Sequence, residues 1–232
     1  MFPFYYFDST TIFVIIGALI TLAASGKVRS AYGKYSKIRS ASPLTGAQVA
    51  QKILLDAGIT DVRVQQTSGH LTDHYDPRSK TVSLSANIYN TNSIAAISVA
   101  AHECGHAIQH AKAYAPLSMR STLAPVASIG SALAWPLIFI GFFFNNQSSL
   151  MFLNLGIIAF SMAVLFQIVT LPVEFNASKR ALTILHDSHI LPLEEMGGAQ
   201  KMLSAAALTY VAAVASSLLQ LLRIVLLSNR RR

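Results

Sequence analysis

Residues 150–171, LMFLNLGIIAFSMAVLFQIVTL, form an apolar run that decides which class of fold this sequence can adopt. The run contains no charged residue and no histidine, and it exceeds the roughly 20 residues that a helix needs to cross the hydrocarbon layer of a bilayer. A helix that is apolar on every side must be surrounded by other apolar groups. The run therefore predicts a membrane-spanning helix.

The composition of the whole chain agrees with this prediction. Of 232 residues, 53% are hydrophobic and only 12% are charged, which is typical of membrane proteins. The formal net charge of +8 comes from basic residues that cluster at the ends of apolar runs, and they are not interleaved with aromatic residues. We therefore expect no nucleic-acid partner. The single cysteine, Cys104, excludes an intrachain disulfide framework and a multi-cysteine zinc knuckle.

Three further apolar runs bring the expected number of transmembrane helices to about four. We expect an N-terminal anchor over residues 1–26, a transmembrane hairpin over 124–171, and an apolar helix with a basic tail over 203–232. The aromatic residues 2–7, FPFYYF, suit an interfacial belt at the start of the anchor. A signal peptide is disfavoured because no Lys or Arg precedes the first apolar core.

Basic residues predict the orientation of these spans. Five of them follow the first apolar run, which places the following segment in the cytoplasm: Lys27, Arg29, Lys34, Lys37 and Arg39. With four spans, the C-terminal SNRRR lies outside, against this tendency, so the last run either spans at a cost or lies partly at the interface. We prefer four spans in a multi-pass protein of the cell membrane.

Residues 40–118 have soluble character and predict a small α+β module. Thr45 and Gln48 have the spacing of a capping box and Gly58 suits a helix end, so a helix is expected between them. The segments VRVQQ and KTVSLSA read as strands of a hairpin-like sheet with DPRSK as the turn, and TVSLS could offer an open edge to a peptide. A long helix is expected over residues 93–113. The fold class is thus a mainly α membrane protein with a small α+β module.

The expected long helix carries an HExxH pattern, formed by His102, Glu103 and His106. Residues four apart lie on one helix face, so both imidazoles can bind one zinc ion. Glu103 can then act as general base on a water molecule at the metal, which produces a nucleophile for a peptide carbonyl. The alternative is a polar helix face at a contact between domains.

This helix does not supply a third ligand in the usual extended pattern. Gln109 stands at the position of the glycine in HExxHxxGxxH, and Lys112 stands at the position of the third histidine. His110 lies about 12 Å from His102 by helix rise, too far to share an ion. A third ligand must therefore come from elsewhere in the chain.

Glu174 is the best candidate for this ligand among the four glutamates of the chain. It follows the apolar run 150–171 directly and returns to the side of the membrane assigned to the HExxH helix, within a segment over residues 172–202. Pro172 suits the first turn of a new helix. Helix capping is the alternative role for Glu174, and Glu194 and Glu195 read as a solvated helix start.

The segment GHLTDHYDP leaves two interpretations open. Its polar side chains are those of His70, Asp73, His74 and Tyr75. One of them could stabilise the oxyanion of a scissile carbonyl. Alternatively, all of them could belong to a hydrogen-bonded turn.

Taken together, these stretches resemble the YugP-like family of membrane-embedded neutral zinc metallopeptidases. The resemblance covers almost the whole chain, through LTGAQVAQKIL, GHLTDHYDPRSKTVSLS, AAHECGHAIQHA, YAPL, LAWPL, FQIVTLPVEFNASKRAL and ALTYVAA. It implies a gluzincin-like module in which His102, His106 and a glutamate matching Glu174 bind zinc and Glu103 is catalytic. Two departures are Cys104, where an aliphatic residue is usual, and Asn176, where an acidic residue is expected.

The sequence therefore predicts a zinc-dependent membrane metalloendopeptidase that acts through zinc-bound water, with Glu103 as general base and its site at the cytoplasmic face. Its expected partners are the lipid bilayer and peptides or membrane proteins, as membrane-associated or misfolded substrates. The rival hypothesis is a non-enzymatic membrane scaffold or chaperone-like protein with structural zinc or none. A transporter is disfavoured because no charged residue lies at the centre of a predicted span.

Overall fold

The computed structural model describes residues 8–144 and 147–230, which are mostly helical. Contacts within the chain separate two compact units. Unit 1 consists of the described parts of Met1–Ser25, Met119–Thr170 and Thr209–Arg232, and unit 2 consists of Gly26–Ser118 and Leu171–Leu208. The predicted aromatic belt at residues 2–7 lies outside the described residues, as do Asn145, Asn146, Arg231 and Arg232.

Four helices contribute residues to unit 1: α1 (Thr11–Tyr35), α5 (Ala115–Phe143), α6 (Gln147–Asp187) and α7 (Leu193–Asn229). Within the described residues, these four are long and apolar enough to cross a membrane. The expectation of about four candidate spans is therefore confirmed, and it includes the C-terminal run.

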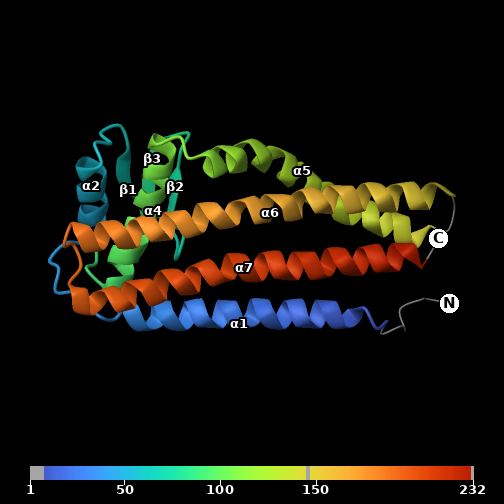
Figure 1. Cartoon of the computed structure of the whole chain (residues 1–232), viewed down its shortest axis with the longest axis horizontal. Coiled ribbons are helices and arrows are strands. Elements are labelled where there is room, and N and C mark those ends of the chain that lie inside the picture. The colour runs from blue at the N-terminus through green and yellow to red at the C-terminus, as the bar shows by residue number, and fades with distance from the viewer. Residues whose placement is uncertain (1–7, 145–146, 231–232) are drawn as a thin grey trace. The chain divides into compact units, whose positions relative to one another are not determined.

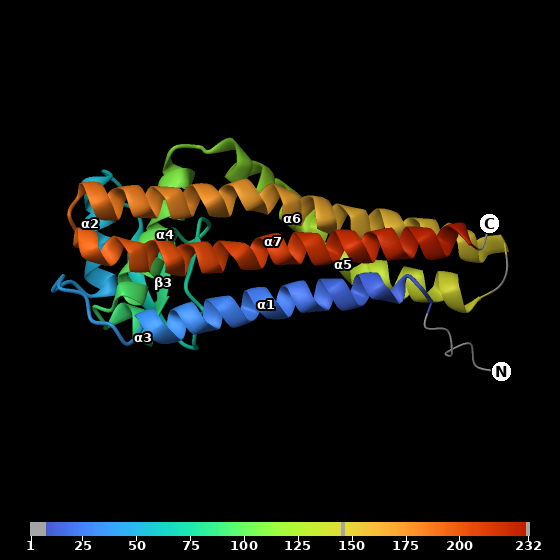
Figure 2. The ribbon, with the colours of Figure 1, turned by 60° about the horizontal axis from the view of Figure 1, so that its bottom comes forward.

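The start of α1 and the end of α7 are in contact within unit 1. Here α1 and α7 lie side by side (Figure 2), and the guanidinium of Arg230 forms an ion pair with the carboxylate of Asp8. Hydrogen bonds from Thr10 and Arg230 lower the pKa of Asp8 to about 2. The start of α1 and the end of α7 thus lie at the same end of unit 1, as an even number of spans requires.

Unit 2 contains the α+β part of the chain. The helix α2 (Gly46–Asp56) begins with the predicted capping box, in which the side chains of Thr45 and Gln48 each accept a hydrogen bond from the other's backbone. The helix α4 (Ile94–Ala111) is capped by Ser93 and packs against α2 and the sheet (Figure 1). Fourteen of its eighteen residues are buried, so α4 lies in the core of this unit.

The sheet differs from the predicted hairpin. It has three strands in the order β1-β3-β2, formed by β1 (Arg63–Thr67), β2 (His74–Asp76) and β3 (Thr81–Ser85). The hairpin joins β2 to β3, whereas β1 pairs with β3 in parallel. The expected open edge of TVSLS is therefore wrong, because β3 is the central strand. Its five residues are all buried, and a short helix α3 (Ala86–Tyr89) follows.

Pro172 does not begin a new helix, and this expectation is also wrong. The helix α6 continues through it to Asp187, as α5 continues through Pro125 and Pro136. Proline removes one backbone donor from a helix, but helices of membrane proteins tolerate this loss where neighbouring groups satisfy the freed carbonyl. The same helix therefore contributes residues to both units and carries Glu174 near its middle.

Candidate metal centre

Three predicted ligands meet in unit 2. The Nε2 atom of His102 lies 3.3 Å from Oε2 of Glu174, and Nε2 of His106 lies 3.6 Å from the same oxygen. One ligand atom from each of the three residues lies within 4.8 Å of the others. The packing of α4 against α6 thus brings together ligands that lie about 70 residues apart in the sequence.

A glycine on α4 makes this packing possible. An ideal Cβ atom at Gly105 would lie only 2.7 Å from the backbone oxygen of Ala177 on α6. Any larger residue would push the two helices apart. Because Gly105 precedes His106 and Ala177 follows Glu174 by about one turn, this close contact of the helices lies beside the ligands.

The donor set fits a zinc ion. Zinc binds imidazole nitrogens and carboxylate oxygens at roughly 2.0–2.2 Å, so two ligands of a tetrahedral ion lie about 3.4 Å apart. The observed separations of 3.3 and 3.6 Å agree with this value. Three protein ligands also leave a fourth position for water or substrate, as catalytic zinc sites require.

Hydrogen bonds orient both imidazoles with Nε2 toward the centre. Nδ1 of His102 lies 3.1 Å from the hydroxyl of Ser178, and Nδ1 of His106 lies 3.0 Å from Oε1 of Gln109. Such partners hold a ligand ring in place and determine which nitrogen is available.

The charge environment of the site favours a cation. Burial by itself lowers the pKa of His106, but the hydrogen bond to Glu174 and the negative charges of Glu103 and Glu174 outweigh burial and raise it. Glu103 is itself buried, with 8% of its surface exposed, and its charge acts on the neighbouring imidazole. A metal ion at this position would be stabilised by the same negative charges.

Two further residues of the HExxH helix, His110 and Cys104, stay apart from the three ligands. His110 is exposed, and its Nδ1 atom is hydrogen-bonded at 2.7 Å to the hydroxyl of Tyr75. Burial raises the pKa of Tyr75 to about 12, and the charges of Asp61 and Asp76 act in the same direction. Cys104 is fully buried in the core, where it packs as a small residue.

Polar residues of the segment GHLTDHYDP form ring contacts and hydrogen bonds with other residues of the chain. His70 packs edge-on against Tyr32, and His74 is hydrogen-bonded to the backbone oxygen of Thr72. Asp73 accepts hydrogen bonds from the backbone and the hydroxyl of Ser85. These contacts give the polar side chains of the segment partners within unit 2.

The two glutamates near residue 194 lie in the first turn of α7. Glu195 is more than a solvated residue, because it accepts hydrogen bonds from the hydroxyl of Ser40 and the backbone of Ala41. It therefore ties the loop after α1 to the start of α7.

Sequence reasoning missed two residues of the site, Ser178 and Gln109. Ser178 lies four residues after Glu174 and so shares its helix face. Gln109 lies three residues after His106, and a fully buried glutamine in an alanine-rich helix needs partners. These spacings were visible in the sequence, but only the position of α6 shows what the side chains contact.

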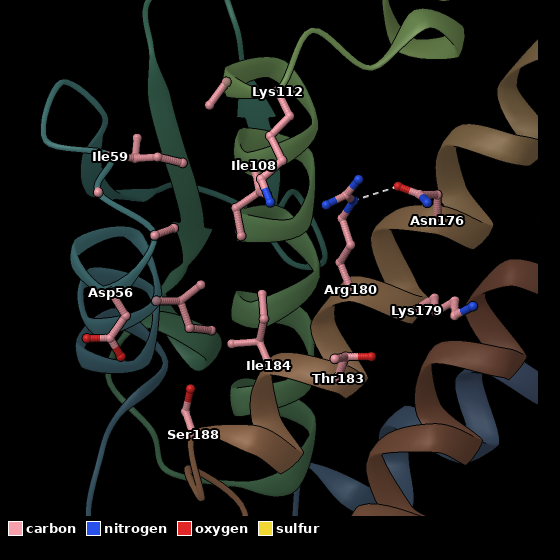
Figure 3. Close-up of a pocket in the computed structure, with 14 residues that line it drawn as sticks. Asp56, Ile59, Ile108, Lys112, Asn176, Lys179, Arg180, Thr183, Ile184 and Ser188 are labelled. Carbon is pink, nitrogen blue, oxygen red and sulfur yellow. Dashed lines mark hydrogen bonds between the residues drawn. The ribbon is translucent and has the colours of Figure 1, made fainter.

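A cavity of about 670 Å³ is lined by residues of α2, α4 and α6 (Figure 3). Its lining includes Ile108 from α4, Lys112 directly after this helix, and Asn176 and Arg180 from α6, but none of the three ligands. In Figure 3 the side chains of Arg180 and Asn176 point toward each other and are joined by a hydrogen bond. The cavity is therefore separate from the metal centre.

Comparison with known proteins agrees with this geometry. A family model described as "Putative neutral zinc metallopeptidase" matches residues 10–229. The chain belongs to this family. It is also 48% identical, over 217 residues, to a protein of Bacillus subtilis (strain 168) named "Putative membrane protease YugP". That match covers 93% of this chain and 95% of the relative. No solved structure matched the chain.

The match to the zinc metallopeptidase family covers the candidate metal centre. The match includes both α4 and the part of α6 that carries Glu174, so the family model spans all three ligands. The four apolar helices agree with the relative's description as a membrane protease.

Proposed function

We propose that this protein is a zinc-dependent membrane endopeptidase with a gluzincin-like site. The observation that carries the proposal is the convergence of His102, His106 and Glu174 around one point, beside the buried carboxylate of Glu103. Two histidines one helical turn apart, with a glutamate after the first, suit the hydrolysis of a peptide bond.

Each residue has a separate role in this proposal. His102 and His106 offer their Nε2 atoms and Glu174 offers a carboxylate oxygen as ligands. A zinc ion held there would polarise the scissile carbonyl and make a water molecule acidic enough to attack at neutral pH. Glu103 takes the proton of the attacking water and delivers it to the leaving amine.

Burial strengthens the role of Glu103 as a base. Its carboxylate lies in a poorly solvated region next to a histidine whose positive form it stabilises. Electrostatic interactions are stronger there than in water, which strengthens the effect of the Glu103 charge on groups at the metal centre.

The substrates we propose are membrane-associated or misfolded proteins, reached from the cytoplasmic face. Support for this side comes from the five basic residues at 27–39, because these residues belong to unit 2, which also contains the metal centre. Support for substrates near the bilayer comes from the four candidate spans of the same chain.

The test compares purified wild-type protein with Glu103→Gln. Both should retain one zinc ion per chain, since Glu103 is not a proposed ligand, while cleavage of an unfolded protein should fall about 10²- to 10⁴-fold. The matched control is His110→Ala on the same helix, which should leave both zinc content and cleavage near the wild-type level.

Equal cleavage by wild type and Glu103→Gln would contradict the proposed mechanism. A wild-type protein that holds zinc but cleaves neither unfolded nor membrane-bound substrates would instead favour structural zinc.

A further inference from the structure

Gln109 is fully buried on α4, one turn after His106, and it bonds to both helices of the metal centre. Its Oε1 atom lies 3.0 Å from Nδ1 of His106. Its Nε2 atom donates to the backbone oxygen of Val173 at 2.8 Å and to Oδ1 of Asn176 at 3.0 Å. A single amide therefore connects one proposed ligand on α4 with the backbone beside another on α6.

The direction of every hydrogen bond in this chain of contacts can be assigned. The guanidinium of Arg180 only donates, so the atom of Asn176 that it meets at 2.7 Å is the oxygen. That oxygen and the carbonyl of Val173 both accept, so Gln109 must present its amide nitrogen to them. The orientation of the glutamine amide is thus determined by its partners.

This orientation has a consequence for His106. Because Oε1 of Gln109 only accepts, Nδ1 of His106 must carry the hydrogen. The Nε2 atom of the neutral ring is then unprotonated and faces Glu174, which is the form that a metal ion requires.

His102 lacks an equivalent restraint. Its Nδ1 atom meets the hydroxyl of Ser178, which can either donate or accept. That hydrogen bond is compatible with both tautomers of the ring. The two histidine ligands are therefore held in different ways, and only the partner of His106 dictates a tautomer.

We propose that Gln109 is a positioning residue, which keeps Nε2 of His106 available and couples this ligand to α6 beside Glu174. Asn176 and Arg180 keep the amide of Gln109 in the required orientation. The proposal rests on the zinc site proposed above, but it does not depend on peptidase activity.

The main test measures zinc affinity by competition with a chromophoric chelator. Gln109→Met keeps the length of the side chain and removes its hydrogen bonds, and it should weaken zinc binding about 10- to 100-fold. The matched control is Gln65→Met, which removes a hydrogen bond to Ser83 in the sheet and should leave zinc affinity unchanged.

Two variants at the less buried Asn176 separate positioning from a general loss of structure. Asn176→Asp keeps an oxygen for both Gln109 and Arg180, so zinc affinity should stay within about threefold of wild type. Asn176→Leu removes this acceptor. It should weaken zinc binding about 10- to 100-fold, as Gln109→Met does. This pair provides a test even if Gln109→Met does not fold.

A second measurement reads the tautomer without metal. The protein used is Glu174→Ala labelled with ¹⁵N-histidine, so that no carboxylate competes for a hydrogen on Nε2 of His106. At a pH high enough for the ring to be neutral, the chemical shifts of His106 should show the hydrogen on Nδ1. When Gln109→Met is added this preference should be lost, while His102 should change little.

Each outcome bears on a definite claim. Gln109→Met with wild-type zinc affinity, or a hydrogen on Nε2 of His106 in metal-free Glu174→Ala, would overturn the positioning role. A wild-type protein that binds no zinc would overturn the proposed function, and the nitrogen shifts of the metal-free protein would still decide the role of Gln109.

Discussion

Two glycines allow a close helix contact, one in each unit, and their surroundings differ. In unit 2, an ideal Cβ at Gly105 would lie 2.7 Å from the backbone oxygen of Ala177. In unit 1, an ideal Cβ at Gly130 would lie 2.8 Å from the backbone oxygen of Ala159. The steric requirement is nearly the same at the two sites.

The residues around the two contacts differ in polarity. Beside Gly105 are the buried polar residues His106, Gln109 and Glu174, all with hydrogen-bonding or ionic partners. Unit 1 has instead a small apolar core, formed by Ala134, Ile138, Leu153 and Ile224. Gly130 thus serves helix packing, whereas Gly105 also brings ligands within reach of one ion.

The two units also place their apolar side chains differently. Most of the exposed large hydrophobic residues belong to unit 1, among them Leu19, Phe139 and Ile158. In unit 2 the large hydrophobic residues are mainly buried in one core around α4. This contrast is expected if lipid solvates the surface of unit 1 and water solvates that of unit 2.

The largest expected effect that tests this comparison is the loss of a ligand. A complete four-ligand zinc site contributes about 10–16 kcal/mol, so Glu174→Gln should weaken zinc binding by at least about a hundredfold. Chelator competition measures this change. The matched control is Glu195→Gln, which removes contacts with Ser40 and Ala41 and should leave zinc binding intact.

If Glu195→Gln lost zinc as completely as Glu174→Gln, the loss would reflect misfolding of unit 2 and not the removal of a ligand.

A smaller effect is expected when the close contact itself is changed. Gly105→Ala forces the backbones of α4 and α6 apart, and such overpacking typically costs about 1–3 kcal/mol, which corresponds to a zinc affinity roughly five- to 150-fold weaker. Gly130→Ala introduces the same methyl group in unit 1. It should lower the melting temperature in detergent while zinc affinity stays at the wild-type value.

Zinc affinity and thermal unfolding should both be measured for this pair. An equal fall in zinc affinity in Gly105→Ala and Gly130→Ala would break the comparison, since it would mean that packing in unit 1 also determines the metal centre.

The smallest expected effect concerns the partner of His102. Ser178→Ala removes a hydrogen bond to a proposed ligand and should weaken zinc binding about tenfold, at the lower end of the range for such partners. Ser161→Ala, elsewhere on α6, removes only a bond to the backbone of its own helix and serves as control. An unchanged affinity in Ser178→Ala would show that the ring of His102 is held by packing alone.

Much of the local structure could be predicted from the sequence. The capping box at Thr45 and Gln48 and the four apolar runs are local patterns, and the structure has both. The HExxH spacing placed His102 and His106 on one face of a helix for the same reason. Such features depend on residues a few positions apart, so tertiary contacts change them little.

The failures concern residues whose role depends on distant partners. Pro172 was expected to begin a helix, but the surroundings of α6 tolerate it in the helix interior. The strand TVSLS was expected at an edge, but β1 and β2 pair with both of its sides. Pairing partners of a strand are chosen by the packing of the whole unit, and a local pattern does not report them.

The sequence alone predicted a membrane protein with about four apolar helices, and it placed a pair of histidines on one helix face. It could do so because helical period and hydrophobic length are local properties. The meeting of α4 with α6 was decided only in three dimensions. A glycine admits a carbonyl there, which brings Glu174 to the histidines and lets the amide of Gln109 span both helices. Contacts across about 70 residues arise from complementary surfaces, and those exist only once the chain has folded.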